Sequence, residues 1–194
     1  WPRLSPSSLE ADNRIDVAQL LATQTHLGQL RGSILHKWFE KIRFLDDDND
    51  GIPYDQDLLP EATAIDSKTD AHWLHELLTQ FRTMLETSVV RQALAPCECE
   101  LWREQAFAVR RDRHLVQGQF DRVMIFRKSD KILGAKLIDF KTYPVTTDQL
   151  ASAVKRHTSQ MNAYRDALSA MLDIKSNMVT TCLLFVDPGY LCVI

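Results

Sequence analysis

Three consecutive stretches of alternating apolar and polar residues restrict the fold of this chain most. They lie between residues 98 and 142 and read "ELWREQAFAV", "HLVQGQFDRVMIF" and "ILGAKLIDFKT". Alternation with a period of two predicts β-strands with one face toward a core. The polar connection "RKSDKIL" between the second and third stretches suits a hairpin, so we expect these two strands to be antiparallel.

Apolar residues spaced three and four apart predict helices on both sides of these strands. The predicted helices cover residues 33–45, 70–95 and 148–173. A further strand, "VTTCLLFV", follows the last helix and turns at residues 187–189 toward "YLCVI". The predicted class is therefore α/β in the α+β sense, with a helical part over residues 1–95 and a sheet and helix over residues 96–194.

The remaining segments predict connections and a single domain. Residues 1–12 are rich in Pro and Ser and predict a linker that leads into a helix capped by Ser7 or Ser8. Residues 46–60 predict a loop, because Gly and Pro interrupt them. A chain of 194 residues fits one domain, and its Trp1 start suggests a domain excised from a longer protein.

Charge and composition narrow the classes of function. With 23 basic and 26 acidic residues the net charge is −3, so a polyanion would be held locally, by a metal ion or by neighbouring domains. No apolar run approaches the roughly 18 residues of a membrane helix and no signal peptide opens the chain, so we expect a cytoplasmic protein without membrane contact. The four cysteines form no C-x-x-C pair, which predicts free thiols and argues against a zinc-ribbon or thioredoxin-like site.

The stretch "KLIDFKTY" places an acid and a base, Asp139 and Lys141, two residues apart in a predicted strand. Residues two apart share a face of a strand, so both side chains point the same way. If the preceding hairpin is symmetric about Asp130, Asp121 of the neighbouring strand lies opposite Asp139. Two carboxylates so placed repel each other unless a divalent cation such as Mg²⁺ lies between them. The alternative is a salt bridge between Asp139 and Lys141 on a solvent-facing edge, with Asp121 unrelated.

Three side chains outside these strands are weaker candidates. Gln160 and Tyr164 lie four apart on one face of a predicted helix, where an amide and a phenol near a metal would orient a phosphate or a water. The alternative is ordinary helix surface. His36 lies near the start of its predicted helix, and a lone histidine there is ordinarily structural. It becomes a ligand candidate only if that helix packs beside the sheet.

The acidic segment "DDDNDGIPYDQD" is a separate candidate site, for calcium. The first half of an EF-hand loop is matched by Asp46, Asp48, Asp50 and Gly51. Asp57 takes the twelfth position, where a Glu is usual, and Pro53 stands in place of the usual Ile. Because no second matched loop accompanies it, we favour a loop that links two helices over a calcium site.

Five stretches occur in one order along the chain: "RLSPSSLE", "LRGSILHKWFE", "GQFDRV", "LIDFKT" and "QMNAY". Together they resemble the RecB/AddA-type nuclease domain of the PD-(D/E)XK superfamily, over residues 4 to about 164. Such domains follow UvrD-like helicases in bacterial recombination and repair enzymes. The resemblance implies a restriction-endonuclease-like core, in which helices flank a central mixed β-sheet.

The resemblance also implies a role for each matching residue. The metal ligands of the family correspond to His36, Asp121, Asp139 and the Phe140 carbonyl oxygen. Glu104, in "REQAF", sits at a frequently acidic position and is an accessory candidate. The implied cofactor is Mg²⁺ or Mn²⁺.

Lys141 matches the lysine that orients or activates the water, and Gln160 and Tyr164 match the helix motif beside the scissile phosphate. The implied function is metal-dependent hydrolysis of DNA, by an exonuclease on single strands or duplex ends that works with a helicase in the same chain or in a partner subunit. A degenerate domain that only binds DNA or braces a partner is the alternative, but the complete residue set favours activity. A calcium-binding interaction module rests on one loop and ranks last.

Overall fold

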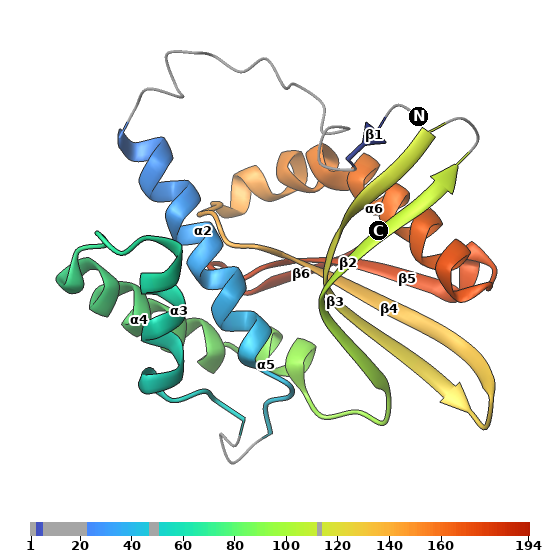
Figure 1. The fold of residues 1–194 in the computed structure, drawn as a ribbon, viewed down its shortest axis with the longest axis horizontal. Helices are drawn as coiled ribbons and strands as arrows, with labels where there is room; N and C mark the ends of the chain where they lie inside the picture. Colours follow the sequence, from blue (N-terminus) through green and yellow to red (C-terminus); the bar gives the residue numbers. More distant parts are fainter. Residues whose placement is uncertain (1–2, 6–22, 47–50, 112–113) are drawn as a thin grey trace.

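A single six-stranded sheet with helices on both faces forms the fold of this computed structural model, which describes residues 3–5, 23–46, 51–111 and 114–194 (Figure 1). The strands are β1 (Arg3–Leu4), β2 (Glu100–Arg111), β3 (His114–Lys128), β4 (Lys131–Lys141), β5 (Val179–Phe185) and β6 (Tyr190–Val193). The helices are α2 (Thr23–Lys41), α3 (Asp55–Ile65), α4 (Ala71–Glu86), α5 (Ser88–Leu94) and α6 (Leu150–Leu172), with 3₁₀ turns η2 (Thr147–Gln149) and η3 (Ser176–Met178).

The long strand β3 organises the sheet, because it pairs with three other strands. It pairs antiparallel with β2, antiparallel with β4 over its second half, and parallel with β1 at Leu115 and Val116. β4 pairs parallel with β5, and α6 lies between these two strands in the sequence. β5 pairs antiparallel with β6. The sheet is therefore mixed and helix-flanked, which confirms the predicted fold class.

Alternate residues of the central strands belong to two separate hydrophobic cores. Ile138 and Phe140 of β4 pack with α2, α3, α4 and α5 on one face of the sheet. Ala135 and Leu137 pack with α6 on the other face. Because successive strand residues point to opposite faces, β4 is apolar on both sides and is buried between the two helical layers (Figure 1).

The hairpin of β3 and β4 follows the predicted register. The pairs from Arg122↔Ile138 to Phe126↔Gly134 are those expected from symmetry about Asp130. A bulge between Phe126 and Arg127 shifts the last pairs before the turn by one residue. The predicted strands between residues 98 and 142 are thus confirmed, with the bulge as an added feature.

The helical half differs from its prediction in three places. The segment predicted as a loop at residues 46–60 contains the start of α3, where Leu58 and Ala62 are buried despite Pro60 inside the helix. The helix predicted over residues 70–95 is two helices, because Thr87 has an extended backbone between α4 and α5.

The third difference concerns the helix predicted over residues 33–45. α2 spans Thr23–Lys41, so His36 lies in its second half and not near its start. Ile42 and Leu45 are buried but follow the helix, which explains why their spacing suggested that it continued.

The amino-terminal prediction is also partly wrong. Arg3 and Leu4 form β1 against β3, not a linker, while Ser7 and Ser8 lie outside the described residues. None of the described helices is long and apolar enough to cross a bilayer. The cysteines Cys97, Cys99, Cys182 and Cys192 are all free, as predicted.

Candidate active site

Three carboxylates occupy neighbouring positions across β2, β3 and β4. The β2–β3 pairs on either side of Glu104 and Asp121 place these two residues at corresponding positions. Asp139 follows Ile138, which forms the last residue pair between β3 and β4. Beyond that pair, Asp121 Oδ2 accepts a hydrogen bond of 2.7 Å from the Phe140 backbone N–H. The Asp121 side chain is therefore held between the two strands where their ladder ends.

His36 approaches this row of carboxylates from α2. Its Nδ1 lies 3.6 Å from Asp121 Oδ2 and 3.7 Å from Glu104 Oε1. One possible ligand atom from each of these three residues lies within 4.8 Å of the other two. Phe39, three residues later on α2, stacks on Phe140 with ring centroids 4.6 Å apart, which keeps this helix against β4.

Glu104 reaches the cluster through an unusual backbone conformation. Its φ is 47°, in the left-handed region that non-glycine residues seldom adopt. Gln119 of β3 donates a hydrogen bond of 2.9 Å to its carbonyl oxygen. Non-glycine residues held in this region cluster at functional sites. Glu104, predicted only as an accessory residue, is thus a full member of the group around His36.

Asp139 and Lys141 form a buried pair on the α6 side of β4. Lys141 Nζ lies 2.9 Å from Asp139 Oδ2, and the side chains are 11% and 5% exposed. The predicted shared face is confirmed. The salt bridge of the alternative reading is also present, but its expected solvent-facing position is wrong, because both residues are buried. Asp139 Oδ2 is buried, and among the described residues it has no hydrogen-bond partner to add to this ion-pair contact with Lys141.

Gln160 and Tyr164 of α6 extend this pair into a chain of polar contacts. Lys141 Nζ donates to Gln160 Oε1 at 3.0 Å, and Gln160 Nε2 donates to the Tyr164 hydroxyl at 3.3 Å. Both α6 residues are buried, so the alternative of ordinary helix surface is wrong. The ring of Tyr164 packs edge-on against Phe120, which fixes its place in the core.

The charges of the cluster shift the acidities of its members. Burial first, and then the charge of Asp139, raise the pKa of Asp121 to about 8. Burial lowers the pKa of His36, but Glu104, Asp121 and Asp139 more than offset this and raise it to about 9. Without a cation both Asp121 and His36 therefore retain a proton at neutral pH, because the site is buried and several carboxylates crowd it.

Sequence reasoning missed a contact between α6 and the segment that directly follows β4. The hydroxyl of Tyr143 lies 2.8 Å from His157 Nε2, beside the Lys141–Gln160 contact. Tyr143 follows Lys141 by two residues and His157 precedes Gln160 by three, so spacing alone could have suggested the pair.

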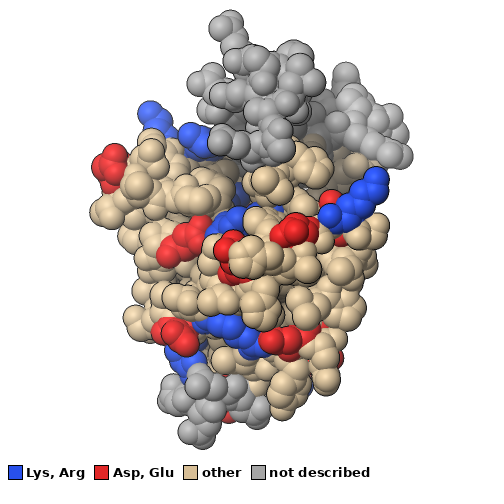
Figure 2. Space-filling model, turned by 90° about the vertical axis from the view of Figure 1, so that its left-hand side faces the viewer, with Lys and Arg blue, Asp and Glu red and all other residues tan. Residues whose placement is uncertain are grey.

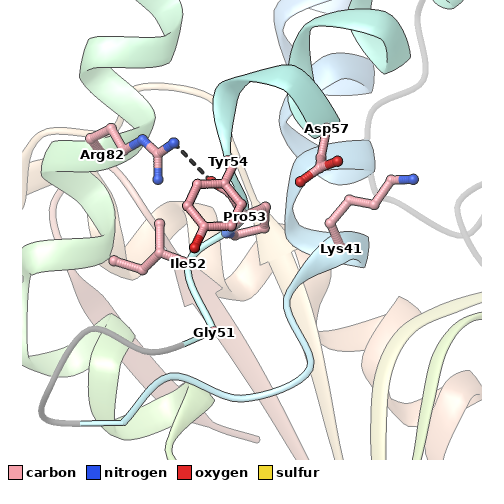
Figure 3. A pocket seen from close by; sticks show the side chains of 7 residues that line it. All are labelled: Lys41, Gly51, Ile52, Pro53, Tyr54, Asp57 and Arg82. Carbon is pink, nitrogen blue, oxygen red and sulfur yellow. Dashed lines mark hydrogen bonds between the residues drawn. The ribbon is translucent and has the colours of Figure 1, made fainter.

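The face of the molecule shown in Figure 2 carries Lys and Arg interspersed with Asp and Glu, in agreement with the small net charge. A surface pocket of about 630 Å³ lies apart from the candidate site. It is lined by Lys41, Gly51, Ile52, Pro53, Tyr54, Asp57 and Arg82 (Figure 3). Its cations are engaged, since Lys41 pairs with Glu61 and Arg82 donates to the Pro53 carbonyl.

The predicted calcium loop is only partly described. Asp48 and Asp50 lie outside the described residues, while Asp57 lies in the first turn of α3. Gly51 has a φ of 89°, and a Cβ there would meet the Phe44 carbonyl oxygen, so this position requires glycine. The calcium site therefore stays a prediction.

The family model described as the PD-(D/E)XK nuclease superfamily matches residues 13–188, which include every residue of the candidate site. A comparison with curated proteins finds no match.

Proposed function

Because the chain belongs to the PD-(D/E)XK nuclease superfamily, we propose that it is a metal-dependent DNA nuclease of the RecB/AddA type. The observation that carries this proposal is the convergence of His36, Glu104 and Asp121 beside the Asp139–Lys141 pair. These residues come from four different elements, α2, β2, β3 and β4, and they bring three carboxylates together, an arrangement that a bound cation would stabilise.

The donor set fits a hard divalent cation. Carboxylate and carbonyl oxygens, which form most of the set, suit Mg²⁺ and Mn²⁺. The raised pKa values of Asp121 and His36 indicate unrelieved negative charge, which such an ion would offset. We assign His36, Glu104 and Asp121 to the ion, together with Asp139 and the Phe140 carbonyl oxygen.

When bound, the cation lowers the pKa of a water molecule and offsets charge on the scissile phosphate. The residues of the chain supply orientation and a fixed positive charge. Lys141 is held between Asp139 and Gln160, so its ammonium group has a defined position before substrate arrives. A preorganised cation stabilises charge that develops on the phosphate oxygens. Tyr164 fixes Gln160 in turn by accepting from its amide.

We further propose an exonuclease that acts on single-stranded DNA or duplex ends in DNA repair or recombination. The five motifs that resemble RecB/AddA nuclease domains support this assignment. The small net charge suits a domain that receives its strand from a helicase in the same chain or in a partner subunit, which would supply most phosphate contacts. We place the protein in the cytoplasm and treat residues 1–194 as one nuclease domain.

The test is cleavage of labelled oligonucleotides by the purified domain. Single-stranded and duplex DNA, labelled at either end, are incubated with Mg²⁺, Mn²⁺ or EDTA, and matched RNA serves as a control for sugar preference. We expect metal-dependent shortening of single-stranded DNA from one end. Release of internal fragments would contradict the exonuclease assignment. Metal-dependent DNA binding without cleavage would contradict the enzyme and favour the inactive DNA-binding domain.

A further inference from the structure

Two arginines on adjacent strands face each other directly, which is an unfavourable arrangement. Arg103 of β2 pairs in register with Arg122 of β3, and like charges opposite each other destabilise a sheet. Arg122 is only 1% exposed. Burial, with the charge of Arg103 as a second cause, lowers its pKa to about 10, so it is still a cation at neutral pH. No carboxylate of the described residues forms an ion pair with it.

Backbone carbonyl groups at and just after the end of helix α2 accept hydrogen bonds from these two cations. Arg103 Nη1 donates to the Glu40 carbonyl oxygen at 2.6 Å, and Arg122 Nη1 donates to that of Ile42 at 3.1 Å. Arg122 also donates through Nη2 to the carbonyl oxygen of Arg43. The last carbonyl groups of a helix have no partner within the helix and form the negative end of its dipole. Glu40 lies in the last turn of α2, whereas Ile42 and Arg43 directly follow it. Arg103 therefore holds the carboxyl end of α2, and Arg122 holds the segment that leaves it.

The same two strands carry the carboxylates that meet α2 at His36. Glu104 directly follows Arg103, and Asp121 directly precedes Arg122. Their oxygens lie 3.7 and 3.6 Å from His36 Nδ1, about one helical turn before the Glu40 carbonyl group that Arg103 holds. Each strand thus contributes one carboxylate to the histidine of α2 and, at the adjacent position, one arginine to the backbone at the end of α2 or directly after it.

We propose that Arg103 and Arg122 are positioning residues that fix the height and rotation of α2, so that His36 meets Glu104 and Asp121 at the metal site. This proposal rests on the proposed function, since it assigns the histidine to a metal ion. Neither arginine touches the ion or the substrate in this assignment. They act through His36.

The test is a double-mutant cycle read out as Mn²⁺ affinity by calorimetry at one pH. The variants Arg103→Met and Arg122→Met remove the donors and keep the side-chain stems, while Arg103→Lys and Arg122→Lys keep one donor. Arg127→Met is the matched control, because Arg127 lies on β3 but pairs with Glu100, away from α2. Each variant is measured with His36 present and with His36→Ala.

With His36 present, we expect the Met variants to bind Mn²⁺ about tenfold more weakly and the Lys variants to recover part of the loss. With His36→Ala, the same Met substitutions should leave the remaining affinity unchanged. Equal losses in both backgrounds would overturn the proposal, because the arginines would then act on the fold generally. If Arg122→Met fails to fold, Arg103→Met, at an exposed position, and Arg122→Lys still decide the outcome.

A metal-free measurement separates this proposal from the proposed function. Hydrogen exchange of the segment 36–42 in EDTA should be faster in Arg103→Met than in the unmodified chain, and unchanged in Arg127→Met. Unchanged exchange in Arg103→Met would overturn the positioning role. A complete lack of Mn²⁺ binding by the unmodified chain would instead overturn the metal site itself, and with it the proposed function.

Discussion

Asp121 Oδ2 accepts the backbone N–H of Phe140 at the point where the β3–β4 ladder ends. If the ladder continued, this N–H would donate to a backbone carbonyl group, but here it donates to a side-chain oxygen. The hydrogen bond favours the ionised carboxylate, yet burial and Asp139 together raise the pKa to about 8. Phe140 therefore fixes the position of the Asp121 carboxylate, while Asp139 disfavours its negative charge.

Asp121→Asn should therefore have opposite effects on stability and on activity. The amide oxygen can still accept from Phe140, but the charge that Asp139 opposes is gone. The native pKa lies above the unfolded value of 3.8, so stability is lost as the pH rises from about 4 through 8. We expect the variant to raise the melting temperature in EDTA at pH 8.5 by about 2–4 °C, which corresponds to about 1 kcal/mol.

The same variant should lose metal-dependent cleavage by at least about a hundredfold. Asp130→Asn is the control, because Asp130 is exposed at the turn of the same hairpin. It should leave both the melting temperature and cleavage unchanged. A lower melting temperature for Asp121→Asn at pH 8.5 would refute the charge-repulsion account.

Lys141→Met and Asp139→Ala should each abolish cleavage while the domain stays folded. The role proposed for Lys141 is to supply fixed charge near the phosphate, so we expect turnover to fall by about 10²–10³. Lys136→Met on the same strand is the control, since residue 136 points to the opposite face from Lys141. Cleavage rates and circular dichroism at equal protein concentration provide the measurement. Full cleavage by either purified variant would exclude the assigned roles.

Gln160→Leu should reduce turnover more than substrate binding. The substitution keeps the volume of the side chain but removes the acceptor that holds Lys141 Nζ at 3.0 Å. We expect kcat to fall about 10- to 100-fold with a small change in KM, as for loss of a group that orients a catalytic residue. Asn162→Ala, exposed on the same helix, should leave both parameters unchanged. An equal rise of KM with unchanged kcat would indicate a substrate contact instead.

Metal affinity should increase with pH across the neutral range. With pKa values of about 9 for His36 and about 8 for Asp121, each group holds a proton at pH 7, so an ion bound by both must displace these protons. For each proton released, Mn²⁺ affinity should rise about tenfold per pH unit until the pH reaches the pKa of the group that releases it. Calorimetry in buffers of different ionisation enthalpy counts the released protons directly. A pH-independent affinity would show that the cluster carries no displaced proton.

The sequence allowed the β3–β4 part of the site to be predicted because its geometry is local. Alternation places Asp139 and Lys141 on one face, and a short hairpin fixes which residue of β3 lies near Asp139. Both relationships follow from the two-residue period of a strand and from the length of one turn. No comparable rule predicts which residues far apart in the sequence lie close together in the fold.

The approach of His36 to Glu104 could not be predicted from the sequence. It depends on the packing of α2, through the Phe39–Phe140 stack and the arginines on β2 and β3, and on a left-handed backbone at Glu104. The helix α3 was missed for a related reason. Tertiary contacts, including the Trp38 Nε1 hydrogen bond to the Leu58 carbonyl oxygen, stabilise a segment whose Pro60 argues against a helix.

The candidate ligands come from α2, β2, β3 and β4, so they meet only in the folded chain. An ion held by them would bind the native state and leave the unfolded state unaffected. Folding and occupancy then become one coupled equilibrium, in which free metal at about a thousand times its Kd adds about 4 kcal/mol to the free energy of unfolding. The atoms assigned to cleavage would therefore also determine how much of the domain's stability depends on its ion.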